Sequence, residues 1–174
     1  MPDFRLRAAT TADLPVLTHL LTQVFHCHLG EQSLAYWFLR ITVQEDLRVK
    51  LRAAAAAEQC WVAIAPAVPE ERPIGYVELE RRRTLPWQAP VPYLSNLAIA
   101  PEWRRQGIAT ALLGQCEQVA RGWGCDRLQL HVLESNLRAR GLYARLAFTQ
   151  QRIDYSWDHW LLGASPRLLL EKRL

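Results

Sequence analysis

The second half of the chain alternates strand-like apolar runs with amphipathic helical segments, and this order limits the possible folds. The pattern predicts strands over 93–100, 127–133, 148–154 and 167–173, and helices over 107–121 and 135–146. A strand–helix–strand order allows neighbouring strands to run in parallel, with the helix packed on the sheet. The sequence therefore predicts an α/β fold with a partly parallel, mixed sheet.

The first half predicts two helices and a hairpin. A short alternating strand over 4–8 precedes a helix that begins at Thr10 or Thr11 and ends near Gly30, and a second helix is expected over 33–58. Apolar runs over 60–65 and 74–82 predict two paired strands. The prolines of 84–92 predict an exposed connection, because proline cannot donate to a sheet ladder.

Length and composition indicate a single soluble domain covering 1–174. Half of the 174 residues are apolar and 22% are charged, which suits one packed core. No apolar run reaches the roughly 18 residues that a membrane helix needs, and the first residues lack a secretory layout. The four cysteines have no CxxC spacing, so we expect a reduced, cytoplasmic location and no membrane partner.

The basic residues favour an anionic partner. The net charge is +4, and arginine supplies all of the basic residues except Lys50 and Lys172. Arginine suits planar, bidentate recognition of phosphate and carboxylate. A nucleic acid is disfavoured, because the triplet Arg81–Arg83 ends a predicted strand without interleaved aromatic residues.

The segment 99–110 runs from a predicted strand directly into a helix. The first-turn N–H groups of such a helix are free and lie at the positive end of its dipole, so phosphate can bind there. Gly107 and Ala109 are small enough for close approach to the backbone, and Arg104 and Arg105 add positive charge. On spacing alone, an ordinary turn with solvated arginines stays open.

This segment and a second one resemble the GNAT superfamily of acetyl-CoA-dependent N-acetyltransferases. The residues Arg104–Ala109 match its R/Q-x-x-G-x-G/A loop, and Asn136–Phe148 match N-x-x-A-x-x-L-Y-x-x-x-G-F, with Ala147 in place of the usual glycine. The resemblance covers about 74–174. Shorter stretches look like the plastid and cyanobacterial branch: Tyr93–Ile99, Trp123–Cys125, Leu130–His131 and Leu170–Lys172.

The resemblance implies a GNAT-like mixed central sheet of about six to seven strands flanked by about four helices. It also implies acetyl-CoA as co-substrate and no metal. The backbone of 97–99 would pair with the pantetheine arm, and the N–H groups of 105–110 would surround the pyrophosphate. Asn136 would contact the cofactor, although it or Ser135 could instead be a helix N-cap. The cofactor-binding candidates are Leu97, Ala98, Ile99, Arg104, Arg105, Gln106, Gly107, Ile108, Ala109, Thr110, Asn136, Leu137, Arg138 and Tyr143.

Two residues are the catalytic candidates. By its place in the signature, Tyr143 would be the general acid for the departing CoA thiolate; otherwise it is a buried packing residue. An acceptor ammonium, with an unperturbed pKa near ~10, needs a base. His131 interrupts an apolar strand at the position where ribosomal-protein alanine acetyltransferases place a glutamate. A satisfied core histidine is the alternative, and Glu78, Glu80, Ser95 or water are rival bases.

The expected function is transfer of acetyl from acetyl-CoA to a primary amine by direct attack in a ternary complex. A protein N-terminus or lysine is favoured as acceptor, and an arylalkylamine or a non-catalytic acyl-CoA-binding module are alternatives. We expect a monomer or homodimer. Adjacent His26, Cys27 and His28 point apart on a helix and do not favour a metal site. The Trp157 and Trp160 loop is expected to shape the acceptor site or to fold back on the core.

Overall fold

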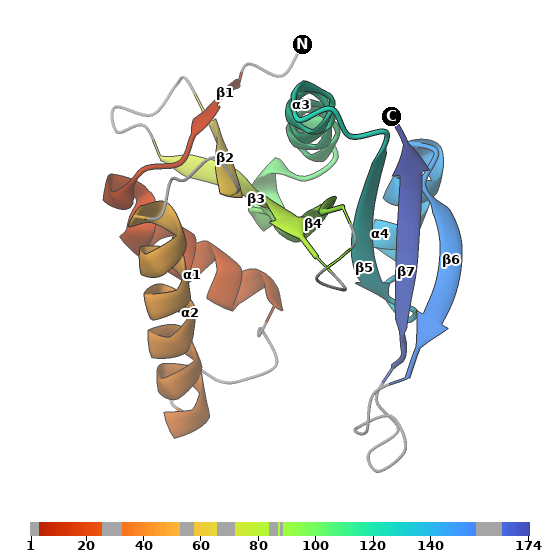
Figure 1. Cartoon of the computed structure of the whole chain (residues 1–174). Coiled ribbons are helices and arrows are strands. Elements are labelled where there is room, and N and C mark those ends of the chain that lie inside the picture. The colour runs from red at the N-terminus through yellow and green to blue at the C-terminus, as the bar shows by residue number, and fades with distance from the viewer. Residues whose placement is uncertain are drawn as a thin grey trace. The chain divides into compact units, whose positions relative to one another are not determined.

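The structure is a computed structural model that describes residues 4–25, 33–52, 58–65, 72–83, 87, 89–155 and 165–174. In these residues the strands form one seven-stranded sheet in the order β1-β2-β3-β4-β5-β7-β6 (Figure 1). The mixed sheet and four α-helices confirm the predicted fold class.

The bounds of the helices and strands are β1 Arg5–Ala8, α1 Leu14–Phe25, α2 Leu34–Arg52, β2 Glu58–Ile64, β3 Pro73–Arg82, β4 Val91–Ile99, α3 Ile108–Gly122, β5 Arg127–Leu133, α4 Leu137–Arg145, β6 Thr149–Asp154 and β7 Arg167–Arg173. Two 3-10 turns are η1 Thr11–Asp13 and η2 Pro101–Trp103.

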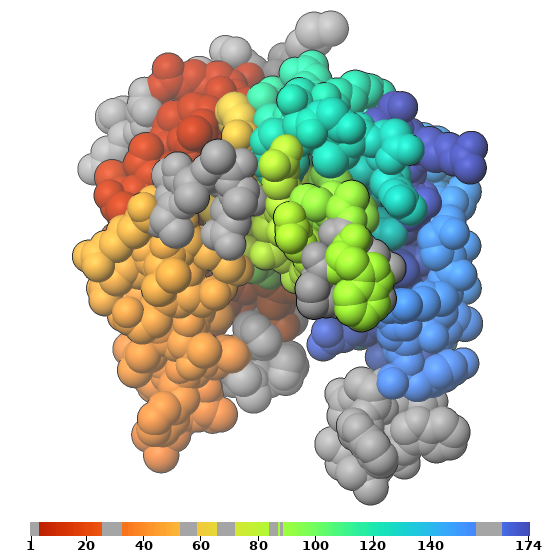
Figure 2. Space-filling view, viewed as in Figure 1, coloured from red at the N-terminus to blue at the C-terminus, as the bar shows by residue number. Residues whose placement is uncertain are grey.

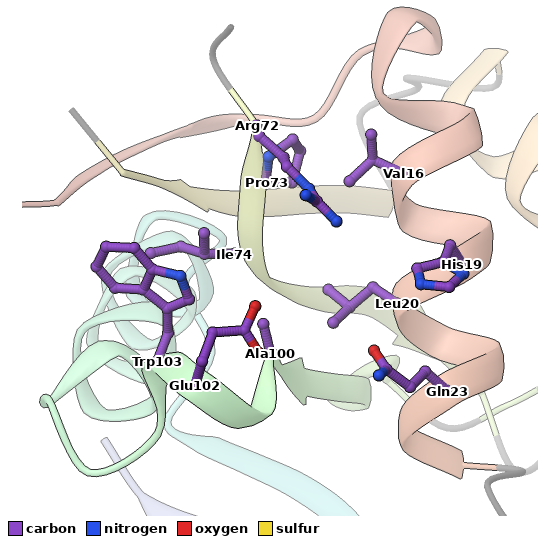
Figure 3. Close-up of a pocket in the computed structure, with 10 residues that line it drawn as sticks. All are labelled: Val16, His19, Leu20, Gln23, Arg72, Pro73, Ile74, Ala100, Glu102 and Trp103. Carbon is purple, nitrogen blue, oxygen red and sulfur yellow. The ribbon is translucent and has the colours of Figure 1, made fainter. Parts of the chain in front are cut away.

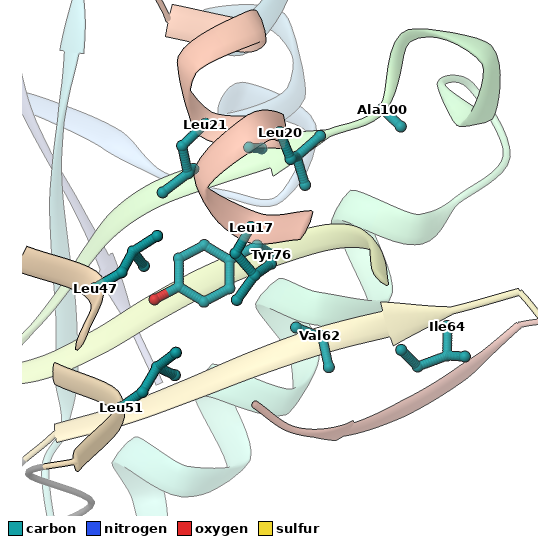
Figure 4. Close-up of a cluster of buried hydrophobic side chains, with 10 residues drawn as sticks. Leu17, Leu20, Leu21, Leu47, Leu51, Val62, Ile64, Tyr76 and Ala100 are labelled. Atoms are coloured by element: carbon teal, nitrogen blue, oxygen red, sulfur yellow. The ribbon is translucent and has the colours of Figure 1, made fainter. Parts of the chain in front are cut away.

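The chain divides into two compact units, one of residues 1–79 and 96–115 (unit 1) and one of residues 80–95 and 116–174 (unit 2). In unit 1, β1 pairs antiparallel with β2. The buried side chains of α1, α2 and the strands form one apolar cluster, shown in Figure 4, whose members include Leu17, Leu21, Leu47, Val62 and Tyr76. This cluster excludes water from the inner faces of both helices.

An ion pair between Arg7 and the buried Asp13 lies at η1, immediately before α1. Both Asp13 carboxylate oxygens accept from the Arg7 guanidinium at 2.7 Å, and the Thr10 backbone N–H donates to Asp13 Oδ2 at 2.8 Å. Thr10 and Asp13 form a capping box, in which the Asp13 carboxylate accepts from the Thr10 backbone N–H. The helical segment therefore begins where the sequence predicts.

In unit 2, the outer strands are antiparallel and one inner pair is parallel. β5 pairs with β7 along its whole length, and β6 pairs with β7 with an irregularity between Gln150 and Arg152. β4 runs parallel to β5 through the pairs Tyr93–Gln129 and Leu94–Leu130, which confirms the predicted partly parallel sheet. Leu128, Leu130 and Leu168 are almost completely buried and form the inner face.

Several predicted boundaries were wrong. α2 ends at Arg52 and Glu58 lies in β2, so the predicted helix over 33–58 is too long. Val91 and Pro92 belong to β4, because proline is tolerated in the first residues of a strand. α4 begins at Leu137, because Asn136 caps it. The residues 26–28, for which no metal site was expected, the alanine run at 53–57 and the tryptophan loop at 156–164 lie outside the described residues.

The helix α2 (orange in Figure 2) carries several exposed apolar side chains. Leu34, Phe38, Ile41 and Val49 are more than half exposed, whereas Leu47 on the opposite side is fully buried. Despite this, no helix among the described residues is long and apolar enough to cross a membrane.

Candidate active site

The segment before α3 forms a cradle of backbone N–H groups in unit 1. Arg105 and Gly107 have φ angles of 66° and 82°, in the left-handed region. Among the described residues, no hydrogen-bond acceptor is found for the N–H groups of Gly107, Ile108 and Ala109. No heavy atom of the described residues lies within 4 Å of a Cβ built on Gly107. Alternating left-handed conformations next to a helix N-terminus create an anion-binding concavity, so the loop fits a phosphate group.

Two side chains of the cradle donate hydrogen bonds to backbone carbonyl groups that precede it in the chain. Arg104 Nε donates to the carbonyl oxygen of Ile99 at 3.1 Å, and Gln106 Nε2 donates to the carbonyl of Glu102 at 3.4 Å. Arg104 therefore ties the end of β4 to the loop, a structural function that its predicted charge contribution did not include. Arg105 and Thr110 are exposed and available to a ligand.

The last residues of β4, 97–99, whose backbone was predicted to bind the pantetheine arm, also lie in unit 1. Asn96 has a φ of 51°, which interrupts the regular extended geometry immediately before Leu97, Ala98 and Ile99. An asparagine adopts this conformation more readily than most residues. No sequence signal marks this irregularity, because Asn96 stands inside an otherwise ordinary apolar strand.

Tyr143 lies on α4 in unit 2 and is only 8% exposed. Its ring packs edge-on against Phe148, with centroids 5.6 Å apart. Within the described part of the chain its hydroxyl has no hydrogen-bond partner, and burial, with a smaller effect of Tyr93, raises its pKa to about 12. Tyr143 is therefore held protonated at neutral pH, as an acid must be.

His131 is bound at both ring nitrogens. Nε2 lies 2.7 Å from Asp154 Oδ2, and Nδ1 lies 2.7 Å from the Tyr93 hydroxyl. Burial raises the pKa of Asp154, but hydrogen bonds from His131 and Arg152 outweigh this and lower it. The ionised carboxylate can only accept, so Nε2 carries a proton, and in the neutral form of the ring Nδ1 accepts from the Tyr93 hydroxyl. Sequence reasoning missed Tyr93 and Asp154 as partners.

The rival bases are engaged in other contacts. Glu78 is buried and accepts from Lys50, Tyr76 and Asn96. Glu80 is paired with Arg82, whose guanidinium also lies 3.6 Å from the centroid of the Tyr93 ring. Ser95 also has a partner in the structure. The Glu78 and Glu80 carboxyl groups are therefore already engaged with donors of the protein itself.

The remaining cofactor candidates lie at the start of α4. The Asn136 side chain accepts from the Ala139 N–H at 3.1 Å, so Asn136 is the N-cap and Ser135 is not. Its amide nitrogen has no hydrogen-bond acceptor among the described residues. Leu137 is 72% exposed and Arg138 is also exposed, whereas Arg140 donates to the carbonyl of Glu134.

A separate pocket of about 120 Å³ lies in unit 1, between α1 and the strand ends (Figure 3). Apolar Leu20, Ile74 and Ala100 face the exposed polar side chains of His19 and Arg72. Sequence reasoning named none of these residues as functional. Among the described residues, no group of three or more His, Cys, Asp or Glu side chains is placed to hold a metal ion.

The mixed sheet and the backbone N–H cradle between β4 and α3 are the arrangement that the sequence resemblance predicted. The sequence profile described as "Acetyltransferase (GNAT) family" matches residues 21–148. Because this match covers more than half of the chain, the protein belongs to that family.

Among curated proteins, the chain is similar to GCN5-related N-acetyltransferase 7, chloroplastic, of Arabidopsis thaliana, with 35% identity over 78 residues. That match covers 45% of this chain and 28% of the relative. GCN5-related N-acetyltransferase 10, chloroplastic, of the same plant is 32% identical over 81 residues. The match covers 47% of this chain and 32% of that relative, so the chain spans less than a third of the length of these curated relatives.

The fold also matches a solved structure along the whole chain. The PaiA N-acetyltransferase of Thermoplasma acidophilum, solved in complex with coenzyme A, gives a TM-score of 0.76 at 17% identity. The match covers 99% of both chains. At this identity the likeness establishes the fold alone.

Proposed function

We propose that the protein transfers an acetyl group from acetyl-CoA to a primary amine, by direct attack of the amine with both substrates bound. The observation that carries the proposal is the pair of tyrosines in unit 2 with opposite surroundings. Tyr93 is hydrogen-bonded to His131, whereas the Tyr143 hydroxyl has no hydrogen-bond partner among the described residues and is held protonated. Tyr93 is suited to relay a proton to His131, and Tyr143 is suited to donate its proton as a general acid.

Binding of acetyl-CoA is assigned to unit 1. The free N–H groups at the start of α3 would hold the pyrophosphate, and the backbone of 97–99 would hydrogen-bond to the pantetheine arm as an added strand. Bound acetyl-CoA supplies an activated thioester carbonyl. Gly107 leaves room for the diphosphate to approach, because no atom of the described part of the chain lies within 4 Å of the position of a Cβ there.

Removal of the amine proton is assigned to Tyr93, His131 and Asp154. The Tyr93 hydroxyl takes a proton from the acceptor, directly or through water, and passes its own proton to His131 Nδ1. The resulting imidazolium is stabilised by the Asp154 carboxylate at Nε2. His131 thus keeps the predicted function of base, but it acts through Tyr93 because both of its nitrogens are occupied.

Protonation of the leaving thiolate is assigned to Tyr143. Its buried hydroxyl keeps its proton at neutral pH and can donate it to sulfur as the C–S bond breaks. No covalent enzyme intermediate is needed. The described cysteines Cys60, Cys116 and Cys125 therefore have no part in the reaction.

The acceptor is proposed to be a protein N-terminus or a lysine side chain. The test incubates the protein with acetyl-CoA and three acceptor sets: peptides with free N-termini, lysine-containing proteins and arylalkylamines. Mass spectrometry then identifies the acetylated products. Acetylated products in the peptide or lysine set support the proposal. If only arylalkylamines are acetylated, the acceptor is an arylalkylamine and the proposed acceptor class is wrong. Binding of acetyl-CoA without any product would instead indicate a non-catalytic binding module.

A further inference from the structure

Glu78 is a buried carboxylate at the centre of a polar cluster in unit 1. It is 4% exposed. The Lys50 ammonium donates to Oε2 at 2.8 Å, and the Tyr76 hydroxyl and the Asn96 amide donate to Oε1 at 3.0 and 2.9 Å. We call Lys50, Tyr76, Glu78 and Asn96 the Glu78 cluster. Burial of an ionised carboxylate is unfavourable unless such partners satisfy it.

The cluster joins three elements of the unit. Lys50 comes from α2, Tyr76 and Glu78 from β3, and Asn96 from β4. Figure 4 shows the Tyr76 hydroxyl directed toward the part of α2 that carries Leu47 and Leu51. Lys50 also pairs with Asp46 at 2.8 Å. Burial lowers the pKa of Lys50, but Glu78 and Asp46 raise it more, so Lys50 stays charged beside the Glu78 carboxyl.

The contact with Asn96 coincides with the irregular point of β4. Asn96 has a φ of 51°, and the three residues after it are those assigned to the pantetheine arm. A residue in the left-handed region persists only where its surroundings hold it there. The hydrogen bond from the Asn96 side chain to Glu78 supplies such a restraint.

We propose that Glu78 is a positioning residue for acetyl-CoA: through Asn96 it holds β4 in the conformation that leaves the backbone of 97–99 free to bind the pantetheine arm. This inference rests on the proposed function. It gives Glu78 a function other than that of a base, and it links α2 to cofactor binding through Lys50.

The test measures CoA affinity by calorimetry, and kcat and its pH profile, in Glu78→Gln, Asn96→Asp and the double variant. Glu78→Gln keeps an oxygen that accepts from Asn96, and Asp46 still pairs with Lys50, so the CoA Kd should change less than about threefold. Asn96→Asp places two carboxylates at hydrogen-bond distance and should weaken CoA binding about tenfold or more. In the double variant the new amide at position 78 can donate to the new carboxylate at position 96, so affinity should return to near wild type.

Asp13→Asn is the matched control, because it neutralises another buried carboxylate of unit 1 that does not touch β4. It should lower thermal stability and leave the CoA Kd unchanged. Loss of turnover and of the pH dependence in Glu78→Gln, with CoA affinity intact, would identify Glu78 as the base and overturn the proposal. An Asn96→Asp variant that is less stable but binds CoA normally would also overturn it. Failure of the wild type to bind CoA would instead refute the proposed function itself.

Discussion

At the scale of single residues, two side chains of the same type can have different functions because their hydrogen bonds differ. Tyr93 and Tyr143 are both 8% exposed. Tyr93 is hydrogen-bonded to His131, whereas Tyr143 has no hydrogen-bond partner among the described residues. Both could be identified from the sequence as members of motifs. The hydrogen bonds of His131 could not, because they join residues 38 and 23 positions apart in the chain.

Tyr143→Phe should lower kcat by about 10²–10⁴-fold, because it removes the proton donor while preserving the ring that packs on Phe148. The CoA Kd should stay within about twofold, since the cradle lies in residues 104–110. Product formation is followed by mass spectrometry and binding by calorimetry. Tyr36→Phe, at another buried tyrosine, is the control. Unchanged turnover in Tyr143→Phe would remove Tyr143 from the reaction.

The pH dependence follows from the raised pKa of Tyr143. A phenol with a pKa of about 12 stays protonated below that pH, so its donor function is lost only as the pH rises toward 12. An unperturbed tyrosine would be half ionised at about pH 10. The single-turnover rate should therefore show no alkaline decline between pH 8 and about 10.5. A decline centred near pH 10 would contradict the assignment of a buried acid.

Ala147→Gly should stabilise the fold. Ala147 has a φ of 64°, a conformation that is unfavourable for a residue with a Cβ by about 1–2 kcal/mol. Glycine relieves this strain, but the unfolded chain gains entropy, which offsets about 0.4–1 kcal/mol. We expect a net gain of about 0.5–1 kcal/mol and a Tm higher by about 2–3 °C, measured by calorimetric unfolding. A lower Tm would show that Ala147 is not strained.

At the scale of elements, the type and order of helices and strands followed from periodicity and turn residues. β5 and β7 match their predicted ranges, because alternating apolar residues mark a strand with one buried face. α2 was overextended, because alanine is the best helix former and local propensity offered no reason to stop before Glu58. The irregularity at Asn96 depends on contacts with β3, which no local pattern encodes.

The contribution of Asp13, at the start of the first helical segment, to the stability of the fold should depend on pH. Burial raises the pKa of Asp13, but the hydrogen bonds from Arg7 and Thr10 outweigh this and lower it below the ordinary value. A depressed pKa in the folded state adds stability that is fully present above pH ~4–5 and is lost as the pH falls through the folded pKa.

Asp13→Asn should therefore lower the free energy of unfolding by about 2 kcal/mol at pH 7, where Arg7 loses its ionised partner. The difference between wild type and variant should shrink as the pH falls below about 4. Urea unfolding at pH 7, 5 and 3 measures both. A difference that stays constant over this range would show that the Asp13 charge contributes nothing.

At the scale of the whole molecule, the two units divide the proposed reaction between them. Unit 1 contains the anion cradle and the Asn96 irregularity, and unit 2 contains both tyrosines, His131 and Asp154. The family match over 21–148 spans parts of both. The division predicts that cofactor binding and chemistry can be impaired separately, by substitutions in unit 1 and unit 2 respectively.

The central claim is that the backbone at the start of α3 holds the diphosphate of CoA, and calorimetric titration tests it most directly. Wild type should bind one CoA per chain, and pantetheine, which lacks the diphosphate, much more weakly. Gly107→Val should weaken CoA binding by at least about tenfold, because a branched side chain is strained at a φ of 82° and occupies the open space of the cradle. It should leave pantetheine binding nearly unchanged. Equal affinity of wild type for CoA and pantetheine, or normal CoA binding by Gly107→Val, would contradict the claim.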